Sequence, residues 1–454
     1  MKKVIFLLFF STLTLHLFSQ KLWTLEECLQ YAQENNLTIK QAYLNADLSK
    51  QNLFQSKMGL LPSLNGNISD NTNFGRNIDP VTNEITVDRI RNNNFGLSSS
   101  VTLFNGFQNL NAIRKSNYDY LASRYDAEKM ANDISVNIVT AYLQLLYNED
   151  LILVSQQKVD VSELQVQRIS NMVEVGTLPA GDLLNTEAQK AQEELQLINA
   201  ESQRDIALLN LKQMLDLPST EDFSIVDFNV EPSEQFTVLS TDDIYNQAIQ
   251  NLPNVKSAES KLQSSERSLA IAQGGRSPRL SMTASLGTAY SSASSKFIGY
   301  DSLATLPLPI YEDYSFEDQF NDNVSQSIGL NLSIPIFNGW QANNRISQAK
   351  IGVLQSQYGL QQSKNDLRKT IEQAQNDALY AHKKYLASKK TVDFQKQSFQ
   401  YTQDKYDLQL ITSYDYNNAK NTLFRAETDL LQAKYDYIFK TQILDFYMGN
   451  PLTF

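Results

Sequence analysis

Phe104-Asn105-Gly106 recurs 233 residues later as Phe337-Asn338-Gly339, and this repetition decides the fold. Further identities continue at the same spacing without a gap, as far as Pro218 and its counterpart Pro451. Chance similarity between two helical segments would not keep an Asn-Gly pair and a proline in step over this length. The sequence therefore predicts two copies of one structural unit.

The limits of the two copies follow from where this spacing changes. Upstream of the motif, matching residues lie 216 apart rather than 233, which predicts a 17-residue insertion in the second copy, around residues 291–323. We place the first structural repeat at residues 20–218 and the second at residues 240–454. Residues 219–239 between them are expected to form a linker or equatorial segment.

Glycine and proline bound very long helices in each copy. Neither residue type occurs from Phe107 to Val175 or from Leu360 to Met448. A helix of the first length would reach about 100 Å, which is wider than a compact domain. The helices are therefore expected to run as antiparallel hairpins along an elongated body. The predicted ranges are about 106–175 and 179–217 in the first repeat, and about 339–408 and 412–448 in the second.

Apolar spacing along the first long helix predicts what it packs against. One stripe steps alternately by four and three residues, as in a coiled coil, and comprises Ala127, Ala131, Ile134, Ile138, Ala141 and Leu145. A second, weaker stripe comprises Val136, Val139, Leu143 and Leu146. Two stripes on one helix predict neighbours on both sides, as in a tube of helices. An ordinary bundle with one wide apolar face remains the alternative.

Between the helices, the apolar period changes from about 3.6 to 2. Four segments alternate apolar with small polar side chains and are predicted strands, at about 62–75, 93–104, 278–290 and 325–337. This pattern is typical of transmembrane β-strands, but a soluble sandwich would show it too. Four strands cannot close a barrel or cover themselves, so the membrane is favoured and other subunits must complete the sheet. Three protomers would supply twelve strands.

The N-terminus and the composition narrow the function. Residues 1–19 are Met-Lys-Lys and an apolar run, which predicts a signal peptide and export, with a retained anchor helix as the alternative. The sequence has only two histidines and one cysteine, which effectively excludes zinc sites, Ser-His-Asp triads and disulfide frameworks. A formal net charge of −11 argues against a nucleic-acid partner. We expect a protein that is not an enzyme and has no metal or cofactor, with carboxylate chemistry the one class left open.

Five motifs, in this order, resemble the TolC family of outer-membrane efflux channels. They lie at residues 24–29, 61–64, 103–107, 175–184 and 336–340. The resemblance implies an α+β, mainly α fold, with duplicated helix hairpins forming a trimeric α-barrel. It also implies four transmembrane strands per protomer, which together form a twelve-stranded trimeric β-barrel.

The same resemblance implies a function. The chain would be the outer-membrane channel of a tripartite efflux or type I secretion system, a passive homotrimeric duct with a long periplasmic extension. Its strands would face outer-membrane lipid. A periplasmic adaptor (membrane fusion) protein and an inner-membrane transporter would open it at its helix tips. A structural or adhesive coiled-coil protein of the periplasm or cell surface is the alternative, but such a protein has no reason to carry the four strands.

The resemblance also implies a gate at the two helix-hairpin turns. Asp415 matches an inward-facing gate aspartate, Tyr406 a gate tyrosine, and Asp182 the aspartate that bonds such a tyrosine. Asn418 stands where a second aspartate is expected, and Ile411 where an arginine is expected. These departures put a salt-bridge lock in doubt.

Two local interpretations stay open at these turns. Asp415 lies three residues after Thr412 and so also completes a capping box, a role compatible with a gate. Gly176, Thr177 and Leu178 match the turn to which the adaptor docks, although a plain turn is the alternative. A ring of three Asp415 carboxylates would attract cations.

Overall fold

The computed structural model describes residues 22–78, 85–86, 89–218, 222–226, 231–236, 240–301 and 308–452. The predicted signal peptide and part of the predicted linker lie outside the described residues. The chain divides into two compact units. The first contains residues up to Leu44, 126–255 and 363 onward, and the second contains residues 45–125 and 256–362. Each unit therefore takes segments from both sequence repeats, so the repeats are not separate domains.

The helices of the two repeats have matching lengths. The two long helices, with 67 residues each, are α3 (Gln108–Glu174) and α8 (Gln341–Asp407). Each continues into a 35-residue helix, α4 (Ala180–Met214) or α9 (Ser413–Tyr447). The shorter helices also pair: α1 (Leu25–Asn35) with α5 (Thr241–Asn251) at 11 residues, and α2 (Leu37–Met58) with α6 (Pro253–Gly274) at 22. The long helices begin and end within three residues of the predicted positions.

A backbone requirement explains why the Asn-Gly motif recurs. Each long helix is preceded by two residues in the left-handed conformation: Gly106 (φ 65°) and Phe107 (φ 60°) before α3, and Gly339 (φ 60°) and Trp340 (φ 67°) before α8. Bulky residues adopt positive φ only rarely. A Cβ atom on Gly106 would lie 2.5 Å from the carbonyl oxygen of Gly274, so only glycine fits there. The same reversal from strand to helix is therefore built twice.

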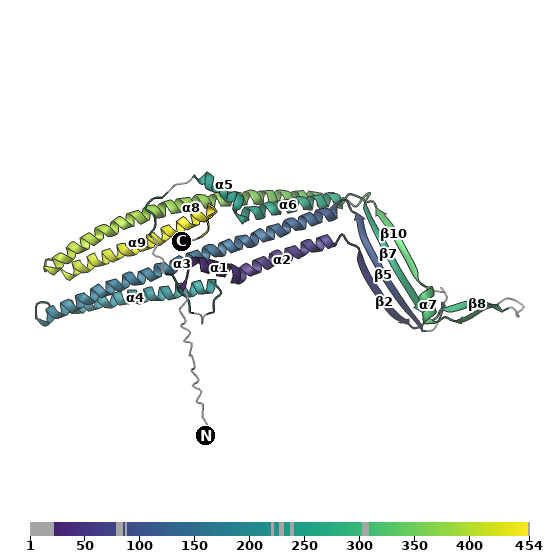
Figure 1. Ribbon diagram of the computed structural model, residues 1–454, viewed down its shortest axis with the longest axis horizontal. Helices are drawn as coiled ribbons and strands as arrows, with labels where there is room; N and C mark the ends of the chain where they lie inside the picture. The colour runs from purple at the N-terminus through teal and green to yellow at the C-terminus, as the bar shows by residue number, and fades with distance from the viewer. Residues whose placement is uncertain are drawn as a thin grey trace, which may run out of the picture. The chain divides into compact units, whose positions relative to one another are not determined.

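The second unit contains a four-stranded antiparallel sheet in the order β10-β7-β5-β2 (Figure 1). Its strands are β2 (Ser63–Asn73), β5 (Ile90–Phe104), β7 (Arg279–Ser291) and β10 (Ser325–Ser333). The central pair joins the two repeats, with Gly96 opposite Gly287. Strand β10 ends at Ser333 rather than at the predicted residue 337, since Pro335 has no N–H to donate to a neighbouring strand.

The strand register separates two kinds of side chain. Because paired residues point to the same side of a sheet and neighbours along a strand to opposite sides, each row can be assigned to a face. One side, the apolar face, carries Leu64, Ile68, Phe95, Leu97, Val101, Met282, Leu286, Ile328 and Leu330. The other, the polar face, carries Asn65, Ser98, Ser100, Thr283, Ser285, Ser327 and Asn331. Large side chains of the apolar face are open to solvent, and Ile328 is 82% exposed.

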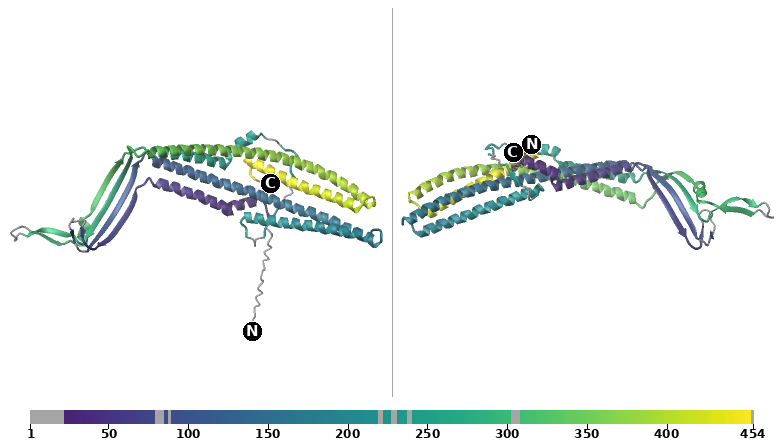
Figure 2. Two further views of the ribbon diagram at one scale, coloured as in Figure 1. Left: turned by 180° about the vertical axis from the view of Figure 1, so that it is seen from behind. Right: turned by 60° about the horizontal axis from the view of Figure 1, so that its bottom comes forward.

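The insertion in the second repeat has a structure of its own. It forms a hairpin of β8 (Ser295–Asp301) and β9 (Leu308–Asp313), followed by the short helix α7 (Phe316–Asp322). The views in Figure 2 place this hairpin at one end of the sheet. Gln319 of α7 is buried and exchanges two hydrogen bonds with the backbone of Ser291, at 2.9 and 3.0 Å. The helix is thereby fixed to the end of β7.

Two short strand pairs complete the described elements. Strand β1 (Leu22–Trp23) pairs in parallel with β6 (Ser224–Ile225), and β3 (Asn77–Ile78) pairs with β4 (Ile85–Thr86). None of the helices in the described ranges is long and apolar enough to span a membrane.

The apolar core of the first unit gathers residues from α1, α3, α4 and α9. Both predicted stripes of α3 contribute to it, with Ile138 and Leu145 from the first and Val139 from the second. Cys28, the single thiol, is fully buried in this core. Tyr142 donates to the backbone carbonyl of Val226 at 3.1 Å, which ties α3 to the segment around β6.

Candidate functional site

The two hairpin turns of the first unit share one backbone design. In the α3–α4 turn, Gly176 has a φ of 78°, and the N–H of Thr177 donates to the carbonyl of Met172 at 2.8 Å. In the α8–α9 turn, Gln409 has a φ of 59°, and the N–H of Leu410 donates to the carbonyl of Lys405 at 2.9 Å. Both long helices therefore end in a left-handed residue that satisfies their last carbonyls, and the second turn does this without glycine.

The two turns border a common pocket of about 370 Å³. The first hairpin contributes Arg168, Ile169, Met172, Thr177, Leu178 and Asp182, and the second contributes Tyr406, Gln409, Ile411, Thr412 and Ser413. The structure thus brings Asp182, Tyr406 and two of the three predicted docking residues together. Gly176, Asp415 and Asn418 do not line this pocket.

Tyr406 has a hydrogen-bond partner that the family resemblance did not predict. Its hydroxyl oxygen accepts a hydrogen bond from Gln165 Nε2 at 2.8 Å, and within the described chain no hydrogen bond joins it to Asp182. In this structure the Tyr406 hydroxyl is therefore bonded from α3, and not by Asp182 as the resemblance implies. Burial raises the pKa of Tyr406, and the Asp182 carboxylate in the same pocket adds to that rise.

An ion pair links the hairpins although Ile411 stands at the expected arginine position. Arg168 of α3 pairs with the carboxylate of Asp407 at the end of α8. Its guanidinium also lies 5.6 Å from the ring centre of Tyr406. No local sequence signal could have matched two residues that are 239 positions apart.

Asp415 acts as a helix cap in this structure. Its N–H donates to Thr412 Oγ1 at 3.2 Å, while its carboxylate accepts from the Thr412 hydroxyl at 2.7 Å and from the Thr412 N–H at 3.3 Å. This is the capping box predicted from the sequence. Asp415 and Asn418 are both exposed and, three residues apart on α9, lie on one face of the helix.

Tyr416 gives this region a measurable response to alkali. It is buried, it stacks on Tyr406 with ring centres 4.7 Å apart, and burial raises its pKa to about 12. Between pH 10 and 12 the unfolded chain loses this proton while the folded chain keeps it, so stability falls as pH rises through that window. We expect Tyr416→Phe to lose less stability than the wild type between pH 9.5 and about 11.5.

The matched control is Tyr414→Phe, which removes a hydroxyl from an exposed ring two residues away. Thermal unfolding midpoints at the two pH values measure the difference. If Tyr416→Phe and Tyr414→Phe lose equal stability at high pH, the raised pKa does not belong to Tyr416.

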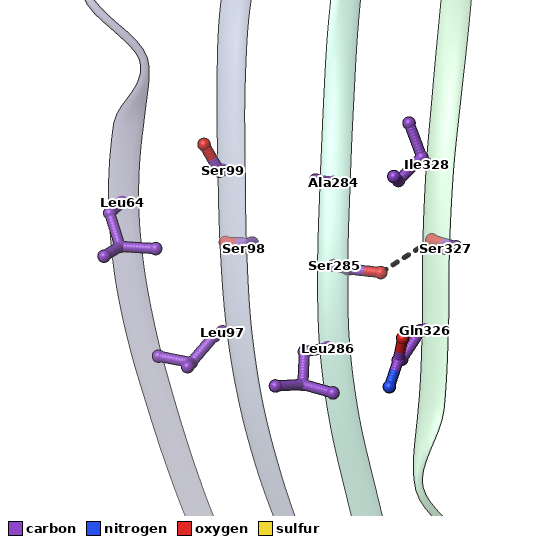
Figure 3. Close-up of a pocket in the computed structure, with 10 residues that line it drawn as sticks. All are labelled: Leu64, Leu97, Ser98, Ser99, Ala284, Ser285, Leu286, Gln326, Ser327 and Ile328. Carbon is purple, nitrogen blue, oxygen red and sulfur yellow. Dashed lines mark hydrogen bonds between the residues drawn. The ribbon is translucent and has the colours of Figure 1, made fainter.

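A second hollow, of about 670 Å³, lies on the sheet of the second unit (Figure 3). Its lining comes from all four strands and includes Leu64, Leu97, Leu286 and Ile328. The hydroxyls of Ser285 and Ser327 bond across neighbouring strands at 2.8 Å, as the dashed line shows. None of its lining residues is charged, and its leucine and isoleucine side chains suit contact with apolar material. In the described ranges, no cluster of His, Cys, Asp or Glu is arranged to hold a metal.

Comparison with known proteins decides the family. The family model described as outer membrane efflux protein matches residues 28–216 and 244–450, which are most of both repeats. The chain belongs to the outer membrane efflux protein family. As a member of this family it is an outer-membrane protein, which confirms the predicted localisation and the resemblance from which it came.

Individual relatives are distant. The outer membrane efflux protein described here is 23% identical to the alkaline protease secretion protein AprF of Pseudomonas aeruginosa over 361 residues, 78% of this chain and 69% of AprF. It is 22% identical to outer membrane protein TolC of Escherichia coli over 310 residues, 67% of this chain but only 58% of TolC. The chain thus matches less than two thirds of that relative's length.

A crystal structure of CusC has the same fold. It superposes with a TM-score of 0.78 at 15% sequence identity, over 94% of this chain and 92% of CusC. At this identity the likeness concerns the fold alone, which agrees with the prediction of a mainly helical protein built from long hairpins.

Proposed function

We propose that this outer membrane efflux protein supplies one third of a homotrimeric, passive exit duct that spans the outer membrane and extends into the periplasm. The observation that carries the proposal is the four-stranded sheet with an exposed apolar face. Its outer strands, β2 and β10, each have one strand neighbour in the described chain. Unpaired backbone groups at such edges are costly in lipid, so the sheet must be closed by further strands.

Three copies would close the sheet into a barrel whose number of strands is found in other outer-membrane proteins. Joining β2 of one copy to β10 of the next gives twelve strands, which is within the even-numbered range of outer-membrane barrels. The apolar face then meets lipid, and the serine-rich polar face meets water in the lumen. The helix hairpins of three copies would line the periplasmic part of the same duct.

A passive duct has no energy source of its own, so it needs partner proteins. A passive channel is not an enzyme, so an inner-membrane transporter must drive the cargo and a periplasmic adaptor must connect the two. One relative is named for the secretion of a protease and another, BepC, as an efflux protein. Both a type I secretion system and a tripartite efflux system therefore fit this chain.

The proposal is tested on protein purified from the outer membrane. We expect detergent-resistant trimers that form conducting channels in planar lipid bilayers. A soluble periplasmic monomer without conductance would overturn the proposal and favour a structural or adhesive coiled-coil protein.

The gate of this duct would lie at the hairpin tips, where Asp415, Tyr406, Asp182 and Asn418 would control passage. The turn of Gly176, Thr177 and Leu178 would receive the adaptor, since Thr177 and Leu178 already border the pocket between the tips. Asp415 and Asn418 share the exposed face of α9 that would meet its symmetry mates at the entrance.

Asp415→Ala is expected to weaken the cation preference of the channel, because it removes a ring of three carboxylates from the entrance. The control is Thr412→Ala, which breaks the same capping box at a cost of about 1 kcal/mol but keeps the charge. Reversal potentials in a salt gradient measure the preference. If both variants change selectivity equally, or neither does, Asp415 serves as a cap only.

A further inference from the structure

Three charged side chains are buried together where α3, α4 and α9 of the first unit meet. The side chain of Glu193 is 0% exposed, and those of Lys158 and Lys420 are each 6% exposed. Charges are removed from water at a high cost unless they are paired and hydrogen-bonded. Neither the family resemblance nor the proposed gate accounts for this cluster.

Every charge in the cluster has specific partners. Lys420 Nζ lies 2.8 Å from Glu193 Oε1, and Lys158 Nζ lies 3.9 Å from the same oxygen. The Ser162 hydroxyl donates to Glu193 and accepts from Lys420. Burial lowers the pKa of Lys158, and Glu193 partly offsets that effect. One carboxylate therefore serves two ammonium groups, and the cluster carries one excess positive charge.

Additional contacts fix the outer members of the cluster. Gln189 Nε2 donates to Glu193 Oε1 at 2.8 Å, and Lys158 Nζ donates to Gln196 Oε1 at 3.1 Å. Lys158 also lies 4.1 Å from the ring centre of Phe424 on α9. These contacts make the cluster specific in geometry, unlike an apolar contact that tolerates sliding.

The cluster joins the two hairpins at a defined distance from their tips. Lys420 belongs to the α8–α9 hairpin and lies about 10 Å along α9 from its start. Its partners all belong to the α3–α4 hairpin. Closer to the tips, the hairpins are joined by the hydrogen bond of Gln165 with Tyr406 and by the partly exposed ion pair of Arg168 with Asp407. Farther from the tips, the contact becomes apolar and includes Leu145 and Leu431 of the core.

We propose that the Lys158–Glu193–Lys420 cluster is a latch that limits how far the second hairpin separates from the first when the tips open. The Arg168–Asp407 ion pair near the tips is partly exposed and therefore weak, because water screens its charges. Parting the hairpins at the cluster would instead break the buried ion pair of Lys420 with Glu193 and the hydrogen bond of Lys420 to Ser162, which costs far more. This proposal rests on the proposed gate at the hairpin tips, and it names three residues that would limit the opening of that gate.

The test variant is Lys420→Met, which removes the second ammonium group and leaves the balanced Lys158–Glu193 pair in place. The matched control is Lys440→Met on the same helix, whose ion pair with Asp377 at 2.8 Å lies within a single hairpin. A spin label at Leu410→Cys reports the tip aperture, because Leu410 is exposed and the native Cys28 is fully buried. One label per protomer gives one set of distances across the threefold axis.

Electron–electron distance measurements on the labelled trimer are expected to shift to longer distances in Lys420→Met and to stay unchanged in Lys440→Met. Should Lys420→Met fail to reach the membrane, Ser162→Ala removes the bridging hydroxyl without changing any charge and should give a smaller shift in the same direction. Equal distances in the wild type and both cluster variants would overturn the latch. The absence of any dipolar signal in the labelled wild type would instead contradict the trimer on which the proposed function rests.

Discussion

Ile328→Arg is expected to keep the protein from assembling in the outer membrane. Ile328 lies within β10, on the apolar face, and is 82% exposed. An arginine on the lipid-facing side of a barrel costs about 2–4 kcal/mol at the middle of the bilayer. Each trimer would carry three of them, so the amount of assembled trimer should fall more than about tenfold. Quantifying trimers in the outer-membrane fraction measures the effect.

The control for this experiment is the neighbouring residue. Ser327→Arg places the same side chain on the polar face, where we expect water in the lumen, so trimers should still form. If both variants assemble normally, the sheet does not lie in lipid. If Ser327→Arg is excluded and Ile328→Arg is not, the two faces have been assigned the wrong way round.

Removing side-chain volume at Ile138 or Ile371 is expected to destabilise the helical unit strongly. The two residues occupy equivalent positions in the two repeats, and both are 0% exposed. Isoleucine to alanine in a core costs about 2–5 kcal/mol, whereas isoleucine to valine costs about 0.5–1.5 kcal/mol. Ile138→Ala and Ile371→Ala should therefore lower the unfolding midpoint much more than Ile138→Val and Ile371→Val do.

Unfolding of purified protein in detergent, followed by circular dichroism at the helical band, provides this measurement. The graded pair at each position controls for nonspecific damage. If the alanine variant lowers the unfolding midpoint at Ile138 but not at Ile371, the two positions are not equivalent in the core.

The sequence was most informative where one residue type has one physical role. The ungapped register from Phe104 to Pro218 predicts helices of matching length, and the structure has them at 67 and 35 residues in both repeats. The Asn-Gly motifs mark backbone reversals that need a left-handed residue. The alternation of Ser327 and Ile328 indicates the two faces of a strand, because side chains along a strand point to opposite faces in turn.

The sequence pattern does not predict which distant segments pair with one another. Alternation assigns a face to β5 and β7 but does not say that they pair across the repeats, and so the two compact units were missed. The insertion around residues 291–323 carried no period that would predict β8, β9 and α7. Glu193 was missed as well, since an acidic residue in a polar helix normally lies on a solvated face.

The candidate site shows the same division. The capping box of Thr412 and Asp415 is local, so four consecutive residues predict it. The contacts that position Tyr406 are long-range, and Gln165 rather than Asp182 provides its hydrogen bond. Family resemblance could name the tyrosine but not its partner, because the partner depends on how two hairpins pack.

The most direct measurement is the structure of the purified protein in lipid nanodiscs by electron cryomicroscopy. The account predicts three copies around one axis, twelve strands closed into a barrel through contacts of β2 with the neighbouring β10, and hairpins that surround open water. A single copy, or helices packed around a filled centre with the apolar face of the sheet enclosed in protein, would contradict it.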